Sequence, residues 1–70
     1  MVDLKVGYVL KNGAVVDYFV ITPHATTVLA YWEGNYHPWV TWRLDEKGNA
    51  HLGNYFKDHE DAAKNLKERI

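Results

Sequence analysis

Few residues in this chain have the types and spacing that catalysis requires. The sequence contains no cysteine and no serine, and its five glycines are isolated rather than gathered in a phosphate-binding loop. The four histidines show neither the His-x-His nor the His-x-x-x-His spacing of a metal site. They are His24, His37, His51 and His59. We therefore predict no catalytic residue, no metal ligand and no cofactor, and a protein that is not an enzyme.

One titratable residue, Asp17, has an unusual expected position. Two apolar alternating runs flank Asn12-Gly13, a pair typical of the two-residue type I′ turn of a β-hairpin. That turn would place Asp17 opposite Tyr8 with its carboxylate facing the core. Buried carboxylates with perturbed pKa values occur at functional sites. A hydrogen bond from Tyr8 or a lysine at the margin of the sheet explains the position more simply.

The aromatic residues concentrate in one stretch, Ala30–Leu44, which contains all three tryptophans and two of the five tyrosines. We expect a β-hairpin with a three-residue loop at Gly34–Tyr36, because that register gathers the most apolar area on one side of the sheet. The first face would carry Val28, Ala30, Trp32, Val40, Trp42 and Leu44. The opposite face would carry Leu29, Tyr31, His37, Trp39, Thr41 and Arg43. A loop of two or four residues would instead exchange the faces of the first strand relative to the second.

The remaining segments predict further strands and one helix. The predicted strands are Leu4–Leu10, Ala14–Ile21, Thr26–Trp32, His37–Leu44 and, at an edge after a polar turn at Asp45–Asn49, Ala50–Tyr55. His59–Arg69 is the predicted helix, because acidic residues fill its first turn and basic residues its last. Its apolar stripe consists of Ala62, Ala63, Leu66 and Ile70, with Phe56 as an anchor upstream. We therefore predict an α+β fold in a single domain over residues 1–70. It would be a five-stranded antiparallel meander, strongly twisted or bent into a half-barrel, with one C-terminal helix on one face.

The second face of this sheet presents a problem, because one helix of this length covers only one face. That face is nevertheless apolar and includes Tyr18, Tyr31 and Trp39, where a solvated face would carry charges. Three arrangements would cover it: bending of the sheet into a half-barrel, self-association, or docking of another molecule.

The same face supplies the predicted binding site. Tryptophan, tyrosine and arginine are enriched at interface hot spots. The predicted binding residues are Tyr18, Tyr31, Tyr36, Trp39 and Arg43. We predict a small binding or regulatory module that contacts a protein partner or forms a homodimer. The alternative is single-stranded nucleic-acid binding by stacking of bases on these rings, which the net charge of −1 does not favour.

Composition sets the broad class. A chain of 70 residues with 47% hydrophobic residues is typical of one small globular domain. The sequence has neither the pattern of a signal peptide nor an apolar run long enough for a membrane span, so we expect a cytoplasmic protein without a membrane partner. The run Gly53–Ala63, with Tyr-Phe before an acidic helix start and Ala-Ala, resembles small proteins of Gram-positive bacteria, and no function follows from that resemblance.

Overall fold

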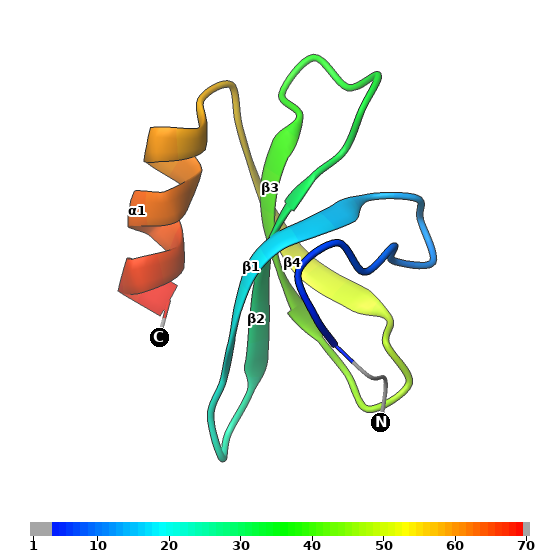
Figure 1. The fold of residues 1–70 in the computed structure, drawn as a ribbon. Coiled ribbons are helices and arrows are strands. Elements are labelled where there is room, and N and C mark those ends of the chain that lie inside the picture. Colours follow the sequence, from blue (N-terminus) through cyan, green and yellow to red (C-terminus); the bar gives the residue numbers. More distant parts are fainter. Residues whose placement is uncertain (1–3, 70) are drawn as a thin grey trace.

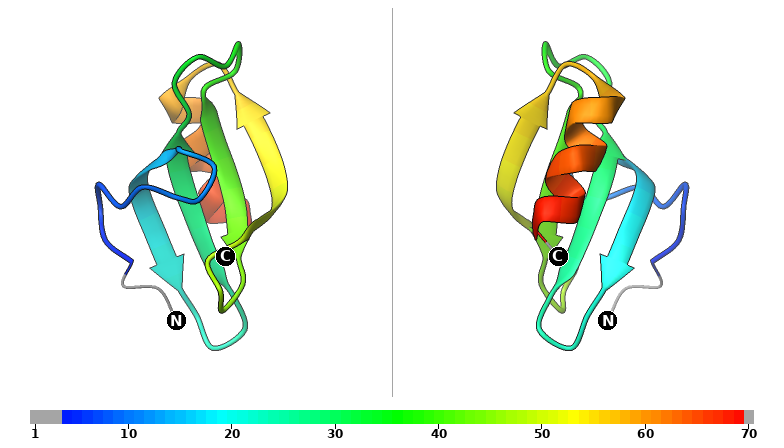
Figure 2. Two further views of the ribbon diagram at one scale, coloured as in Figure 1. Left: turned by 90° about the vertical axis from the view of Figure 1, so that its right-hand side faces the viewer. Right: turned by 90° about the vertical axis from the view of Figure 1, so that its left-hand side faces the viewer.

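The computed structural model describes residues 4–69, which form a sheet, one helix and an irregular N-terminal segment (Figure 1). The strands are β1 (Val15–Ile21), β2 (Thr26–Tyr31), β3 (Trp39–Leu44) and β4 (Ala50–Phe56), and the helix is α1 (His59–Arg69). The sheet is antiparallel in the order β1-β2-β3-β4. The helix packs on one face, called here the helix face, and residues 4–14, called the N-terminal arm, lie against part of the other, the arm face (Figure 2). The predicted α+β fold with one C-terminal helix is confirmed.

The predicted first strand, Leu4–Leu10, is wrong, and the sheet has four strands rather than five. Within the arm, Val9 forms an isolated bridge to Val15. The chain turns at Gly7, whose φ of 92° is a conformation that glycine adopts without steric cost. The N–H of Gly7 still donates to the carbonyl of Val16 at 2.7 Å, so the arm remains attached to the edge of β1.

The turn that joins the arm to β1 has three residues rather than the expected two. The N–H of Leu10 donates to the carbonyl of Ala14 at 2.8 Å, and Gly13 adopts a φ of 93° between them. Asn-Gly suits this turn as well, because a type I turn followed by a left-handed glycine is the next commonest hairpin connection. The additional residue shifts the register by one. Consequently Val16 is buried and Val15 is exposed, the reverse of the prediction for a two-residue turn.

The predicted half-barrel is also wrong. β1 and β4 lie at opposite edges of an open sheet, so the sheet does not close on itself. A separate segment covers part of each face instead. The arm supplies Leu10 and Tyr8 to the arm-face core, and the helix supplies Ala62 and Leu66 to the helix-face core.

The predicted register of the aromatic hairpin is confirmed. Tyr31 pairs with Trp39 and Thr26 with Leu44, as a three-residue loop at Gly34–Tyr36 requires. The ladder ends earlier than predicted, because the chain between Tyr31 and Trp39 is irregular around Pro38, which has no N–H to donate. The alternation of the two faces is therefore as expected, and each tryptophan lies on the side that the sequence predicts.

The arm-face core contains the tryptophans of one side of the hairpin. Its buried members are Leu10, Ala14, Val16, Val28, Ala30, Val40, Trp42 and Leu44. The Trp42 ring lies edge-on to Trp32 at 5.3 Å and to Tyr55 at 6.1 Å between ring centroids. Trp42 also lies directly over the backbone of β4, since a Cβ on Gly53 would be 2.5 Å from its Nε1. A Cβ at this position would therefore force the indole or the strand to shift.

The helix-face core is smaller and depends on α1. The helix begins and ends where the sequence predicts. Leu29, Ala62 and Leu66 are buried together, and Trp39, Phe56 and Ala63 pack against them. The predicted role of Phe56 as an anchor is thus confirmed, whereas Ile70, the last residue of the predicted stripe, lies outside the described residues.

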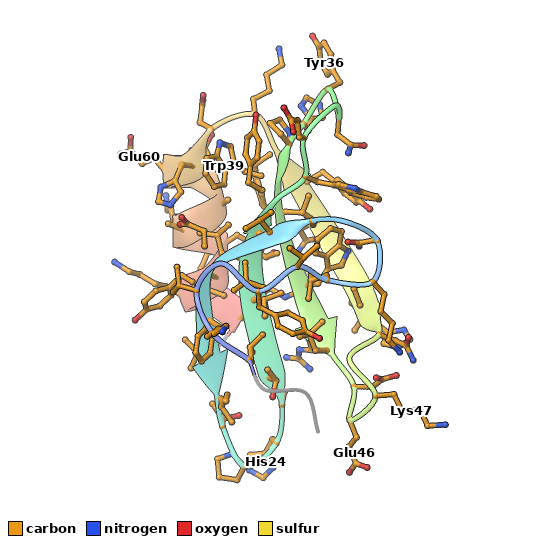
Figure 3. All side chains as sticks on the ribbon, turned by 45° about the vertical axis from the view of Figure 1, so that its right-hand side comes forward. His24, Tyr36, Trp39, Glu46, Lys47 and Glu60 are labelled. Atoms are coloured by element: carbon orange, nitrogen blue, oxygen red, sulfur yellow. The ribbon has the colours of Figure 1, made fainter. Side chains whose placement is uncertain are left out.

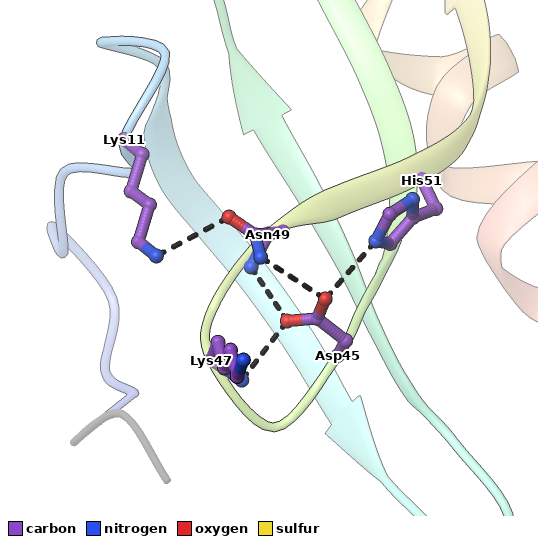
Figure 4. Close-up of polar contacts among 5 residues, drawn as sticks. All are labelled: Lys11, Asp45, Lys47, Asn49 and His51. Atoms are coloured by element: carbon purple, nitrogen blue, oxygen red, sulfur yellow. Dashed lines mark hydrogen bonds and ion pairs between the residues drawn. The ribbon is translucent and has the colours of Figure 1, made fainter.

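The turn between β3 and β4 is organised by one carboxylate (Figure 4). Asp45 accepts hydrogen bonds from the backbone N–H groups of Asn49 at 2.8 Å and Lys47 at 2.9 Å, and its other oxygen lies 3.1 Å from Nε2 of His51. These bonds, with that from the Asn49 backbone as the largest cause, hold the pKa of Asp45 far below its usual range. The predicted polar turn at Asp45–Asn49 is confirmed, and within it Gly48 has a left-handed conformation with a φ of 83°.

Candidate binding surface

Trp39 is covered mainly by the helix. Its side chain is partly buried and packs against the helix-face core. Its ring lies edge-on to Tyr31 at 4.9 Å and to His59, in the first turn of α1, at 4.7 Å between centroids. Figure 3 shows Trp39 beside the start of the helix. Trp39 therefore joins the helix to the sheet, and only part of its ring contributes to an outer surface.

The helix leaves one part of the helix face uncovered. Among residues 4–69, the backbone of α1 lies close to β2, β3 and β4 but not to β1, which only the side-chain pair Asp17–His59 links to the helix (Figure 2, right). Exposed apolar side chains gather on this uncovered part of the helix face, with 57% of Tyr18 and 40% of Tyr31 accessible to solvent. Two exposed valines extend the patch, because Val9 bridges to Val15 and Val15 pairs with Tyr31 on the same face. We call Val9, Val15, Tyr18 and Tyr31 the tyrosine strip.

A β-bulge in β1 creates the strip. The ladder shifts between Val16 and Tyr18, so one additional residue, Asp17, is accommodated in β1. Because of the bulge, Val15 and Tyr18 both face the helix side, while Val16 and Phe19 both pack against the arm-face core. Without it, strict alternation would place Val15 and Tyr18 on opposite faces.

Asp17 itself lies at the border of the strip rather than in the core. Its side chain is exposed, and Oδ2 lies 2.9 Å from Nε2 of His59. The predicted position opposite Tyr8 is wrong, because both the bulge and the three-residue turn change the register. The predicted location near a margin of the sheet is confirmed, with a histidine as partner instead of a tyrosine or a lysine. The pair Asp17–His59 joins β1 to the start of α1 beside the strip.

Tyr36 lies apart from the strip, at the tip of the β2–β3 loop (Figure 3). It is the most exposed of the large hydrophobic residues, with 80% of its surface accessible. The Lys57 Nζ lies 4.7 Å from the centroid of its ring, and the His37 ring lies edge-on at 4.8 Å. These contacts hold the tyrosine at the tip of the loop.

Arg43 also lies apart from the strip, although it shares the helix face. It pairs with Thr27 of β2 and His51 of β4, two rows of side chains beyond Trp39. Burial and, as the smaller cause, the charge of Arg43 lower the pKa of Arg69 in the last turn of the helix. Of the five predicted binding residues, the structure thus brings Tyr18, Tyr31 and Trp39 together and places the other two elsewhere.

Sequence reasoning missed Val15 and His59 as neighbours of this surface. Val15 was expected on the opposite face, because neither the three-residue turn nor the bulge has a unique signal in the sequence. His59 was expected as an ordinary residue of the first helical turn. Val9 lies on the same face as Tyr18, because it bridges to Val15.

Two kinds of feature are absent from the part of the chain that the structure describes. Within residues 4–69, no three histidine, aspartate or glutamate side chains are arranged to hold a metal ion. No helix of that part of the chain is both long enough and apolar enough to span a membrane. No protein-family model, no curated protein and no solved structure matches the chain.

Proposed function

We propose that the protein is a small non-enzymatic binding module whose protein partner docks on the tyrosine strip. One observation carries the proposal: exposed apolar side chains gather on the part of the helix face that the helix leaves uncovered. Monomeric proteins rarely leave large contiguous apolar patches bare, and such patches mark interaction sites. Tyrosine is among the residues that contribute most to binding energy at interfaces.

Polar groups at the border of the tyrosine strip favour a specific contact with a partner over a purely hydrophobic one. The Asp17–His59 pair offers polar groups next to Tyr18, and a polar rim around an apolar centre is typical of protein interfaces. A second copy of the chain is the partner that can be tested first, because two strips related by a two-fold axis would present the same side chains to each other.

The test measures self-association with a matched pair of variants. Light scattering after size-exclusion chromatography, over a range of concentrations, should show a dimer that dissociates on dilution. Tyr18→Lys should weaken the dimer strongly, because it places a charge in the apolar interface. Tyr36→Lys, an equally drastic change at a more exposed tyrosine outside the strip, should leave it unchanged.

Two results would contradict this form of the proposal. A wild-type chain that stays monomeric at millimolar concentration, without concentration-dependent amide shifts in β1, would exclude a second copy as the partner. Equal effects of the two variants would show that the strip is not the interface. Circular dichroism of both variants controls for loss of fold.

Single-stranded nucleic acid is a second candidate, favoured by the exposed rings of Tyr18 and Tyr31 on a sheet face. The distance of Arg43 from these rings weighs against it, because backbone contacts supply most of the affinity. Titration with a short oligothymidylate at two salt concentrations tests it. Binding should weaken steeply with salt and depend on Tyr18, and binding without salt dependence would contradict it.

A further inference from the structure

Three aromatic rings meet at the rim of the arm-face core, at the end of the sheet where Trp32 follows β2 and Tyr55 nears the end of β4. The ring centroids of Trp32 and Trp42 lie 5.3 Å apart, those of Trp42 and Tyr55 6.1 Å, and those of Trp32 and Tyr55 6.4 Å. The Trp32 and Tyr55 rings are inclined to each other by only 29°, whereas Trp42 is inclined to them by 64° and 85°. Two nearly parallel rings therefore flank a third that stands across them. We call these three residues the aromatic cluster.

The aromatic cluster is fixed on its inner side and exposed on its outer side. Trp42 is buried, with 4% of its surface accessible, and lies over Gly53. Trp32 is partly buried, and its backbone N–H donates to the carbonyl of Pro38 at 2.7 Å. Tyr55, in contrast, keeps 49% of its surface accessible to solvent. Packing of the core therefore accounts for Trp42 but leaves much of Tyr55 and part of Trp32 available to a ligand.

The N-terminal arm lies over other parts of the arm face. Leu4, the first described residue, lines a groove with Ile21, at the opposite end of the sheet from the cluster. Further along the arm, Nζ of Lys11 donates to Oδ1 of Asn49 at 3.2 Å, just before the start of β4, whereas Tyr55 is near the end of that strand. The described part of the arm therefore leaves the outer side of the cluster uncovered.

The arrangement of the rings suits a cation. The face of an aromatic ring carries partial negative charge and attracts a cation that lies within about 6 Å of the ring centroid. Because the three centroids lie within 6.4 Å of one another, a cation at the outer side can be in this range of all three rings.

The polar atoms of the cluster indicate which kind of cation fits. They are two indole N–H groups, which only donate hydrogen bonds, and the hydroxyl of Tyr55. An unmethylated ammonium group would exchange its hydrogen bonds with water for few acceptors there, which is unfavourable. A fully methylated ammonium group has no N–H to satisfy and presents apolar methyl groups to the rings.

We propose that Trp32, Trp42 and Tyr55 bind a methylated ammonium group. Small choline-like compounds and peptides that contain trimethyllysine both carry this group. In each of them the cation stands at the end of a flexible chain, so it can approach the exposed side of Tyr55. The site lies on the opposite face of the sheet from the tyrosine strip and does not depend on the proposed protein contact.

The experiment is a titration of the full chain with tetramethylammonium chloride, choline chloride and a short peptide that contains one trimethyllysine. Ammonium chloride and the unmethylated peptide are the matched controls for charge. The NMR signals of the indole N–H groups report the site, since Trp32 and Trp42 belong to the cluster and Trp39 lies on the helix face. We expect saturable shifts at Trp32 and Trp42 with tetramethylammonium and no shift at Trp39.

Three variants test the contribution of the rings. Tyr55→Leu keeps an apolar side chain but removes the ring, and it should weaken tetramethylammonium binding about five-fold. Tyr55→Phe keeps the ring and should stay within about two-fold of wild type. Tyr36→Leu removes a more exposed tyrosine outside the cluster and should leave binding unchanged. Equal losses in Tyr55→Leu and Tyr36→Leu, with both variants folded by circular dichroism, would overturn the proposal.

Titration of the wild-type chain also tests the site without any variant. Shifts that rise linearly, or that ammonium chloride and the unmethylated peptide reproduce, would overturn the proposal. Binding of choline without the peptide would assign a small ligand, and binding of the peptide without choline would assign a modified protein. The dimer test changes Tyr18 and this test changes Tyr55 on the other face, so failure of the proposed function and failure of this site are distinguishable.

Discussion

The two sides of the aromatic hairpin differ in how completely the rest of the molecule covers them. On the arm face, Trp42 is buried against Trp32 and lies over Gly53, so the backbone of β4 is shaped to accept the ring. On the helix face, Trp39 is only partly buried, and its neighbour Tyr31 is exposed at the border of the tyrosine strip. The same strand pair therefore provides a closed core on one face and an incompletely covered surface on the other. Aromatic content alone does not distinguish these roles, whereas the position of α1 does.

The largest expected effect tests the closed side. Trp42→Ala should destabilise the protein by about 3–5 kcal/mol, because it removes a buried indole and leaves a cavity. Trp39→Ala should cost less, about 2 kcal/mol, because part of that ring is already in contact with solvent. Chemical denaturation followed by far-UV circular dichroism measures both. Equal costs would contradict the contrast between the two faces.

The second prediction concerns the fit between Trp42 and β4. Gly53→Ala should cost about 1–3 kcal/mol, since its Cβ would lie 2.5 Å from Nε1 of Trp42 and 3.2 Å from Cε1 of Tyr55. In the double variant with Trp42→Ala the cost of the alanine should largely disappear, because the clashing ring is gone. Additive free energies of unfolding in this cycle would show that the indole does not require the glycine.

A smaller effect is expected at the border of the strip. His59→Ala removes the pair with Asp17, in which both side chains are about half exposed, and also the edge-on contact with Trp39. We expect a loss of about 0.5–1 kcal/mol, within the range of exposed pairs. Asp17→Asn, which keeps the shape and a hydrogen-bonding oxygen, should cost less than His59→Ala. Thermal unfolding at neutral pH measures the difference, and the reverse order would assign the stabilisation to the charge of Asp17.

The smallest expected effect on stability concerns Asp45, in the turn between β3 and β4. Since hydrogen bonds lower the pKa of Asp45 in the folded state, its ionised form stabilises the fold above the usual carboxylate pKa of about 4, and this stability is lost as the pH falls further. Asp45→Asn should therefore lower the melting temperature at pH 7. The difference in melting temperature between the variant and wild type should disappear under strongly acidic conditions. A gap that stays constant with pH would contradict this role of the carboxylate.

The sequence was sufficient to predict the ends of the helix and the register of the aromatic hairpin. The ends of α1 were predictable because the charges at both ends match the helix dipole. The hairpin register was predictable because a three-residue loop gathers the most apolar area on one side of the sheet. The arm was not predictable, since Asn12-Gly13 suits turns of two or three residues equally well. The face of the sheet against which the helix packs was not predictable either. Both faces are apolar, and only the packing of the complete chain decides between them.

The candidate site was predictable in part for the same reasons. Tyr31 and Trp39 follow from the hairpin register, and their contact was implied by their pairing. The place of Tyr18 beside them depends on the bulge at Asp17, which has no unique signal in a single sequence.

The outer edge of β4 has a consequence for the addition of a further strand to the sheet. Leu52 in that strand adopts a φ of 54°, and the ladder with β3 is irregular at this point. A neighbouring strand that added to this edge would find its hydrogen-bonding groups out of step after a few residues. Irregular edges of this kind protect small sheet proteins from growing into fibrils. At the opposite edge, the arm already occupies the beginning of β1. Addition of a further strand is therefore disfavoured at the bulge of β4 and at the beginning of β1.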